Sequence, residues 1–175
     1  MQNDFISGTL SNYHTNQVEQ DVVKEIMSEK YDVILFTKDK HSDYSYFNTL
    51  EGKKIPVKHC IENTDGQNLT WDIMLKIDSL IEDGDKEIVI FEKDRFCSLA
   101  LGEFLNQELC VDENDIITII GVCTDICVVS NALYLRAMFP NTQIKVISSC
   151  CAGTSIKAHF DSLTVMENCN IDIEY

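Results

Sequence analysis

Three short polar segments carry the residue types of this chain that could do chemistry. They read "TKDKH" at residues 37–41, "EKDRF" at residues 92–96 and "CTDIC" at residues 123–127. Each segment comes where an apolar run of strand length gives way to polar residues. Since parallel strands end at one edge of an open sheet, where ligands bind, we expect the three segments to meet in one site.

Cys127 is the candidate nucleophile. We expect it in the first turn of a helix that Thr124 or Asp125 caps. A helix N-terminus favours a thiolate, and Lys93 from the neighbouring segment would add a full positive charge. On this segment alone, the alternative is a small buried cysteine. A metal pair with Cys123 is disfavoured because compact sites usually separate two cysteines by two residues, whereas three intervene here.

A second group of residues has the chemistry of metal ligands. Asp39 and His41 lie one residue apart, His59 follows in "VKHC", and Glu51 in "TLEGKK" could be a fourth ligand. Mixed carboxylate and imidazole ligands suit Zn, Fe or Mn with open water positions. The alternative is a solvated loop with two ordinary histidines.

Composition limits the classes of partner. The chain has 175 residues, 45% hydrophobic residues and a formal net charge of −15. Length and hydrophobic content suit one globular domain, residues 1–175. The negative charge argues against nucleic acid and anionic membranes as partners. Because no signal-peptide pattern or long apolar run is present, we expect a cytoplasmic protein with a small-molecule substrate, and a homo-oligomer is possible.

The remaining cysteines predict no disulfide framework, since such frameworks belong to small secreted chains. Six of the eight cysteines lie mostly within apolar segments, and we expect them to be reduced and buried: Cys60, Cys97, Cys110, Cys150, Cys151 and Cys169.

Strands and helices are predicted to alternate along most of the chain. The expected strands are 31–39, 87–91, 115–122, 143–150 and 171–174. The expected helices are 17–30, 70–83, 98–109, 125–138 and 156–168. Residues 38–69 show no periodicity and predict a long loop that is either functional or disordered, and the first residues also look loop-like. This order predicts an α/β fold: a mostly parallel sheet with helices on both faces.

Four motifs together resemble the isochorismatase-like cysteine hydrolases, in particular their nicotinamidase/pyrazinamidase branch. "GVCTDICV" is similar to the nucleophile motif of the family, "FEKDRF" to its lysine motif and "TKDKH…KHC" to its metal site. "MQNDF" is similar to the end of the family's N-terminal "DMQNDF" motif. The resemblance extends over nearly the whole chain, with the motifs in the family's order.

The resemblance implies a three-layer αβα sandwich built on a six-stranded parallel sheet. It implies that Cys127 is the nucleophile and that Lys93 supports its thiolate. It also implies a cis peptide bond between Val122 and Cys123, with the backbone N–H groups of Cys123 and Cys127 forming an oxyanion hole. Phe5 would line the substrate pocket.

The resemblance also implies a metal site and a reaction. Asp39, His41, His59 and, less directly, Glu51 match the ligands of a divalent metal, with Zn the first expectation and Fe or Mn as alternatives. The reaction would be hydrolysis of a small amide through a thioester on Cys127. By analogy with the branch, nicotinamide would give nicotinate and ammonia.

The chain departs from the family pattern at two places. In the family, an apolar strand ending in the catalytic Asp directly precedes "MQNDF", so we expect this first strand to be missing from the 175 residues. Asp4 matches only the second, structural acid of the motif. Pro56 stands near the position where nicotinamidases commonly have a Trp. These departures leave open a hydrolase of another small molecule, such as an amide or a vinyl ether, and an inactive binding protein of the same fold.

Overall fold

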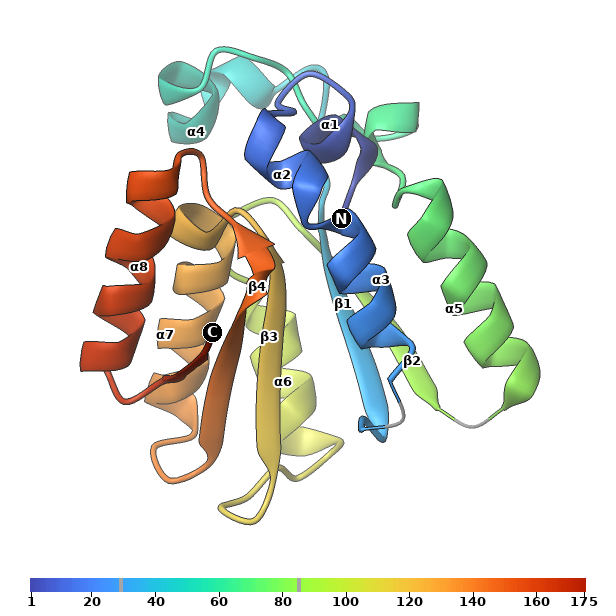
Figure 1. The fold of residues 1–175 in the computed structure, drawn as a ribbon. Coiled ribbons are helices and arrows are strands. Elements are labelled where there is room, and N and C mark those ends of the chain that lie inside the picture. The colour runs from blue at the N-terminus through green and yellow to red at the C-terminus, as the bar shows by residue number, and fades with distance from the viewer. Residues whose placement is uncertain (29, 85) are drawn as a thin grey trace.

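The computed structural model describes residues 1–28, 30–84 and 86–175 and alternates strands with helices (Figure 1). Its strands are β1 (Val33–Asp39), β2 (Glu87–Lys93), β3 (Ile116–Val122), β4 (Gln143–Ala152) and β5 (Asp172–Glu174). Its longer helices are α3 (Glu19–Ile26), α5 (Trp71–Asp83), α6 (Leu99–Gln107), α7 (Val129–Met138) and α8 (Ile156–Asn168). Short helical elements complete the described chain: α1 (Asn3–Ile6), α2 (Tyr13–Gln17), η1 (Tyr46–Asn48), α4 (Leu50–Lys54), η2 (Asp65–Gln67) and the π-helical turn η3 (Thr124–Val128).

The strands of the described chain form two parallel sheets. One sheet pairs β1 with β2 in register over their whole length, so that Asp39 lies opposite Lys93. The other has the order β3–β4–β5, again with parallel pairs. Parallel strands need crossover connections, and helices provide them here. The sequence-based prediction of parallel strands is therefore confirmed, although the five strands are divided between two sheets.

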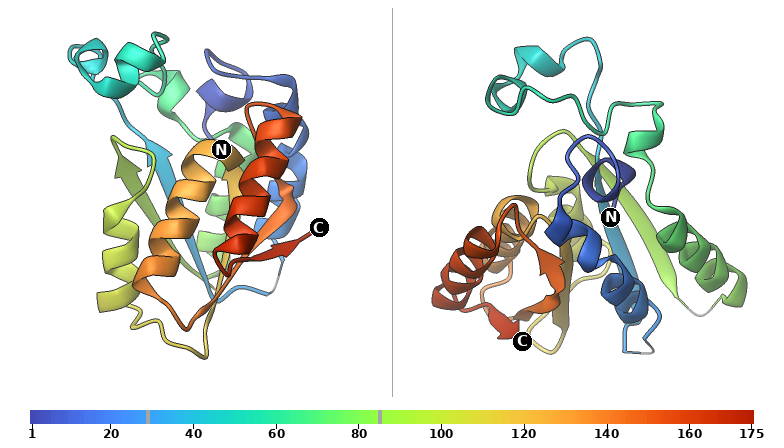
Figure 2. Two further views of the ribbon diagram at one scale, coloured as in Figure 1. Left: turned by 90° about the vertical axis from the view of Figure 1, so that its left-hand side faces the viewer. Right: turned by 45° about the horizontal axis from the view of Figure 1, so that its top comes forward.

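Helices cover both faces of the strands, which gives three layers (Figure 2). On one face α6, α7 and α8 pack against β3 and β4 around a core that includes Leu105, Leu135 and Leu163. On the other face α3 and α5 enclose a second core that includes Ile26 and Ile73. Each helix buries one apolar side, as its 3.6-residue spacing of apolar residues predicts.

Several local predictions were wrong. The stretch 38–69 contains η1, α4 and η2, and the first residues form α1 and α2. The expected helix 17–30 is shorter and begins after α2. All eight cysteines are free, but Cys110 is exposed and Cys97 and Cys169 are only half-buried. Side-chain N-caps account for two of the missed helices: Asn12 caps α2, and Thr49 caps α4.

Within residues 1–28, 30–84 and 86–175, every helix is too short or too polar to cross a membrane.

Candidate active site

The three polar segments come together at the carboxyl ends of β1, β2 and β3. Lys93, the last residue of β2, forms a buried ion pair with Asp39, the last residue of β1. The same Lys93 ammonium lies 3.5 Å from the sulfur of Cys127. The Lys93 ammonium also donates to the carbonyl of Arg95 at 3.0 Å, which fixes the position of its charge. A carboxylate, an ammonium and a thiol are therefore in direct contact.

Cys127 lies in η3, the turn that joins β3 to α7. The peptide bond between Val122 and Cys123 is cis, as the family resemblance implied. The carbonyl of Cys123 accepts hydrogen bonds from the N–H groups of Ile126 and Val128, both at 3.1 Å, and so closes the turn. This wider π-turn places Cys127 toward β2 before α7 begins.

The predicted side-chain cap of this helix was wrong. Cys123 is the N-cap, and no side chain caps the turn. The Thr124 hydroxyl instead lies 2.8 Å from Nδ1 of His159, and the Asp125 carboxylate accepts from the N–H and hydroxyl groups of Thr154 at 2.8 and 2.6 Å. These bonds tie η3 to α8 and the loop before it.

Asn131 is a site residue that sequence reasoning missed. Its side-chain amide donates to the carbonyl of Cys127 at 2.7 Å and to that of Phe96 at 3.2 Å. Its side-chain oxygen accepts from the N–H of Ser98 at 2.9 Å. Asn131 therefore joins the loop after β2 to the turn that carries Cys127. A lone Asn in an apolar helix was the only sequence signal for this role.

The thiol of Cys127 is harder to ionise than the sequence suggested. Burial raises its pKa to about 12, the charge of Asp39 raises it as well, and Lys93 lowers it. Lys93 thus acts in the expected direction, but burial outweighs it. Burial also disfavours the charge of Lys93, yet its contacts with Cys127 and Asp39 raise the pKa of Lys93 overall. At neutral pH the resting site therefore holds an ammonium and a protonated thiol, and ionising Cys127 requires a base.

Asp39, His41 and His59 form a buried cluster beside this thiol. One potential ligand atom from each residue lies within 4.8 Å of the others. The His41 ring comes from the loop after β1, and His59 reaches the same place because the chain bridges back between His41 and Ile61. Stretch 38–69 therefore closes on itself at the carboxyl end of β1.

Contacts outside the cluster hold Nδ1 of His59 and leave its Nε2 for the cluster. Nδ1 of His59 lies 3.1 Å from the carbonyl of Val57 and 3.2 Å from the hydroxyl of Tyr46, which itself donates to the carbonyl of Ile55 at 2.8 Å. A backbone carbonyl at Nδ1 favours the tautomer with a free Nε2. Tyr46 was missed because nothing in its aperiodic surroundings marks it.

The donor set fits a divalent metal. Nε2 of His41 is buried and has no hydrogen-bond partner within the described residues, an arrangement that a metal bond would relieve. Glu51 lies close, with its Oε1 atom 3.4 Å from Nε2 of His59 and 3.7 Å from Nε2 of His41. Two imidazoles with one or two carboxylates are typical of a site that leaves coordination positions for water or substrate.

The two histidines differ in their affinity for protons. Burial lowers the pKa of His41, so its neutral, metal-binding form is favoured. Burial also acts to lower the pKa of His59, but hydrogen bonds with Glu51 and the Val57 carbonyl, together with the charge of Asp39, raise it overall. A metal would therefore compete with a proton at His59.

Side chains of the N-terminal segment bind the backbone of residues in or next to the cluster. The Gln2 side chain accepts from the N–H of Asp39 at 2.7 Å and donates to the carbonyl of the same residue at 2.8 Å. The Asp4 carboxylate accepts from the N–H of Cys60 at 2.7 Å, in agreement with a structural role. Phe5, the expected pocket residue, stacks in a tilted geometry 5.6 Å from the His59 ring. Gln2 was missed because its partner is backbone.

Layers, parallel strands and a site at their carboxyl ends define a three-layer αβα protein. A family model described as the isochorismatase domain matches residues 1–173. The chain therefore belongs to the isochorismatase family.

Solved structures show the same fold. A nicotinamidase of Bacillus subtilis has a TM-score of 0.83 at 23% identity, covering 99% of this chain and 94% of its own. A pyrazinamidase/nicotinamidase of Streptococcus mutans has a TM-score of 0.83 at 24% identity, with 98% and 94% covered. A Pyrococcus horikoshii pyrazinamidase solved with zinc has a TM-score of 0.74 at 20% identity, with 100% and 95% covered. No curated protein matches this chain.

Proposed function

We propose that this chain is a cysteine-dependent hydrolase of a small amide, with nicotinamide as the first candidate substrate and nicotinate and ammonia as products. The observation that carries the proposal is the contact of the Cys127 thiol with the Asp39–Lys93 ion pair, beside the cluster of Asp39, His41 and His59. Membership of the isochorismatase family and the fold of nicotinamidase structures support it.

Cys127 would attack the amide carbonyl after losing its proton to a carboxylate. Because burial keeps the resting thiol protonated, the reaction must begin with this proton transfer. The family resemblance assigns the acceptor to an Asp directly before "MQNDF".

Attack on the carbonyl would form a tetrahedral oxyanion. The backbone N–H groups of Cys123 and Cys127 are the proposed donors to this oxygen, and one such donor is typically worth about 3 kcal/mol. The intermediate would then break its C–N bond, releasing ammonia with the transferred proton and leaving a thioester on Cys127. Water would cleave the thioester to the acid and restore the thiol.

Asp39, His41 and His59, with Glu51 alongside, would hold a divalent metal, for which Zn is the first expectation. When bound, such a metal would supply a Lewis acid for a substrate atom or for water. Phe5, next to His59, would then present an aromatic wall to the substrate ring.

Ammonia release from nicotinamide tests the proposal. We expect release from the chain extended at Met1 by an apolar strand ending in Asp and from its Cys123→Ala variant, whose role is confined to backbone, and none from its Cys127→Ala variant. The contradicting result is release that continues in Cys127→Ala. Release from a different small amide, with the same dependence on Cys127, would keep the chemistry and replace nicotinamide as the substrate.

A further inference from the structure

The imidazole of His159 joins two segments that lie far apart in the sequence. Its Nδ1 atom lies 2.8 Å from the hydroxyl of Thr124, in the turn η3 that carries Cys127. Its Nε2 atom lies 3.2 Å from the hydroxyl of Ser148, in the part of β4 where the register with β3 shifts. His159 itself lies near the start of α8. One ring of α8 therefore contacts both the turn of the candidate nucleophile and a strand of the sheet.

The two ring nitrogens of His159 have opposite hydrogen-bonding roles. Burial lowers the pKa of His159, although the charge of Asp125 acts to raise it. The ring is therefore neutral at neutral pH, with one nitrogen that donates and one that accepts. Because a hydroxyl can take either role, a single tautomer satisfies both contacts. Partners on both sides thus hold the ring in one orientation.

Thr124 depends on this ring more than Ser148 does. The Thr124 side chain is fully buried, and within residues 1–28, 30–84 and 86–175 its hydroxyl has no other hydrogen-bond partner than His159. The Ser148 side chain is also buried, but its contact with the ring is longer. A buried hydroxyl without a partner disfavours the conformation that buries it. Loss of the ring would therefore release Thr124 from its position.

The backbone of Thr124 is part of the nucleophile turn. Cys123, a proposed oxyanion donor, precedes Thr124 directly, and Cys127 follows three residues later. The carbonyl of Thr124 accepts from the N–H of Val129, the first residue of α7. A displacement of Thr124 would therefore move the N–H groups of Cys123 and Cys127 on either side of it.

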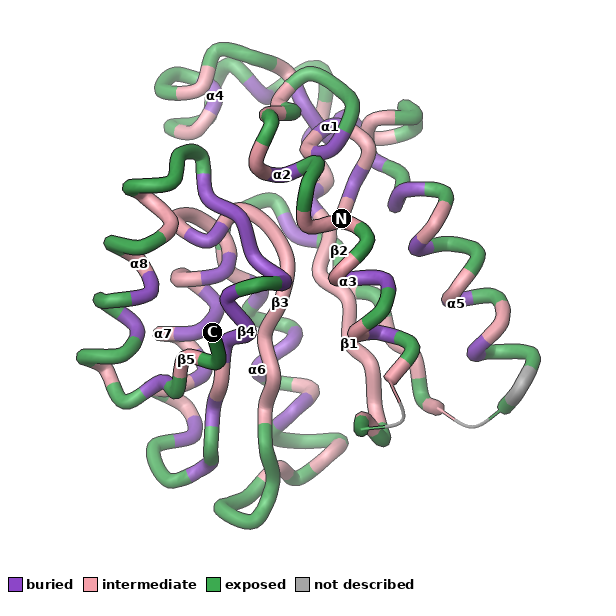
Figure 3. Tube along the Cα trace, viewed as in Figure 1, coloured by how far each residue is buried: buried purple, intermediate pink, exposed green. Residues whose placement is uncertain are grey.

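Gly153 allows α8 to approach η3 closely enough for this contact. The chain passes here from the buried end of β4 to the exposed start of α8 (Figure 3). A Cβ atom on Gly153 would lie 2.9 Å from the Asp125 carboxylate and 2.9 Å from the backbone nitrogen of His159. Both distances are too short for nonbonded carbon contacts. A side chain at this position would therefore push α8 away from η3.

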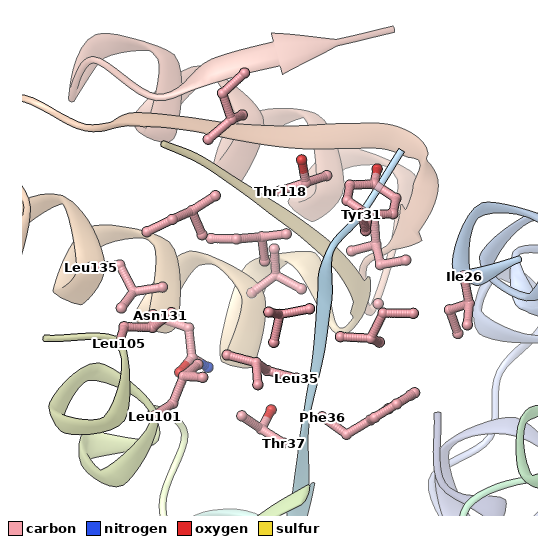
Figure 4. A pocket seen from close by; sticks show the side chains of 18 of the residues that line it. Ile26, Tyr31, Leu35, Phe36, Thr37, Leu101, Leu105, Thr118, Asn131 and Leu135 are labelled. Carbon is pink, nitrogen blue, oxygen red and sulfur yellow. The ribbon is translucent and has the colours of Figure 1, made fainter. Parts of the chain in front are cut away.

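Asn131 binds the other end of the same turn. Its side-chain amide donates to the carbonyl of Cys127 at 2.7 Å. Three leucines of α6 and α7 line the same space as Asn131 (Figure 4): Leu101, Leu105 and Leu135. His159 and Asn131 thus reach η3 from different helices, one at its beginning and one near its end. Removal of His159 should therefore affect mainly the beginning of the turn.

We propose that His159 is a positioning residue for the candidate active site: by binding the Thr124 hydroxyl, it holds the turn that presents Cys127 and the N–H of Cys123. The ring acts through Thr124 and not on the substrate. Its effect on the turn is independent of any reaction, whereas its effect on catalysis rests on the proposed function.

Residue-resolved hydrogen exchange tests the proposal in the chain itself, without substrate. The amides of Ile126 and Val128 report the turn, because both bond to the Cys123 carbonyl. Amides of the helical core, such as those of Leu105 and Leu135, report opening of the whole domain. His159→Ala should speed exchange of the turn amides about tenfold relative to the core amides.

His14→Ala is the matched control for this measurement. His14 of α2 and His159 line the same cavity of about 200 Å³. The His14 side chain makes no hydrogen bond to η3 within the described ranges 1–28, 30–84 and 86–175. Its removal should therefore leave the ratio of turn to core exchange unchanged.

Two conservative variants separate the Thr124 contact from the Ser148 contact. The amide of an Asn side chain lies near the position of the imidazole Nδ1, whereas the longer Gln side chain reaches the position of Nε2. His159→Asn should therefore restore slow exchange of the turn amides, and His159→Gln should restore little of it. Thr124→Val keeps the shape and removes the hydroxyl, so it should reproduce His159→Ala. Combining Thr124→Val with His159→Ala should add little, because both remove one interaction.

Steady-state kinetics tests the consequence for catalysis in the chain extended at Met1 by an apolar strand ending in Asp. His159→Ala should lower kcat about tenfold and leave KM within about twofold, because a displaced turn affects the transition state more than substrate binding. His159→Asn should recover most of kcat. An inactive extended parent would count against the proposed function alone, since the exchange measurement needs no turnover.

Three results would overturn the positioning role. The first is a parent ratio of turn to core exchange in folded His159→Ala. The second is recovery by His159→Gln that equals recovery by His159→Asn. The third is an unchanged kcat of His159→Ala in an active extended chain. If His159→Ala does not fold, Thr124→Val and Gly153→Ala decide the question: both should speed the turn amides, and an unchanged ratio in Thr124→Val contradicts the proposal.

Discussion

Replacing Lys93 by Met should weaken the thiolate of Cys127 and slow its alkylation. The ammonium lies 3.5 Å from the sulfur, and one unit charge at that distance stabilises the other by about 1.2 kcal/mol in water and about 4.7 kcal/mol at an effective dielectric constant of about 20. Loss of this interaction would lower the thiolate fraction of Cys127 roughly 8-fold at the smaller energy and roughly 3000-fold at the larger. A more basic thiolate is also more nucleophilic. The labelling rate should therefore fall only by about the square root of the fall in thiolate fraction, roughly 3- to 50-fold.

The assay is alkylation with limiting iodoacetamide, read for each cysteine by peptide mass spectrometry. Cys110 is exposed and serves as the internal reference. Because the pKa of Cys127 is raised to about 12, its labelling should increase about tenfold per pH unit from neutral pH to about pH 10, without a plateau. The double variant Asp39→Asn/Lys93→Met, which also removes the charge that opposes the thiolate, should recover most of the loss. A Cys127 rate unchanged by Lys93→Met, in a protein of unchanged Tm, would refute the electrostatic reasoning.

Two further predictions concern the metal cluster and Asn131. Elemental analysis of untagged protein should show near-stoichiometric divalent metal, which His59→Ala should lose. His14→Ala, outside the cluster, should retain the metal. Metal that stays bound in folded His59→Ala would contradict the assignment of the site. Asn131→Ala should lower the free energy of unfolding by about 2–4 kcal/mol, because the buried N–H of Ser98 and the Cys127 carbonyl lose their partner. Urea denaturation measures this, with exposed Asn106→Ala as the matched control, and equal stability of the two variants contradicts the role.

The sequence predicted which residues meet at the carboxyl edge of the strands. That grouping depends only on the order of apolar strands and polar segments along the chain. An apolar run followed by polar residues places Asp39, Lys93 and Cys127 at equivalent strand ends whatever the details of packing. The observed parallel pairing sets Asp39 opposite Lys93, in agreement with this order. Asp39, His41 and His59 were likewise grouped by residue type and by their place after the first strand.

What the sequence did not predict depends on contacts between distant segments. The raised pKa of Cys127 comes from burial, whereas the local signals of a helix terminus and a nearby lysine both indicated the opposite. Gln2 and Asn131 act through the backbone of residues far along the chain, so no spacing marks them. The short helix α4 depends on a cap at Thr49 rather than on periodicity.

The central claim is that Cys127 carries the acyl group during amide hydrolysis, and trapping the intermediate tests it most directly. The chain extended at Met1 by an apolar strand ending in Asp is mixed with nicotinamide and quenched in acid, where thioesters persist, and its cysteine peptides are analysed by mass spectrometry. The account predicts a nicotinoyl group on the peptide containing Cys127 and an unmodified Cys127 peptide in the absence of substrate, with Cys123→Ala giving the same adduct. Ammonia release without any adduct at Cys127, or an adduct that persists in Cys127→Ala on another residue, would contradict it.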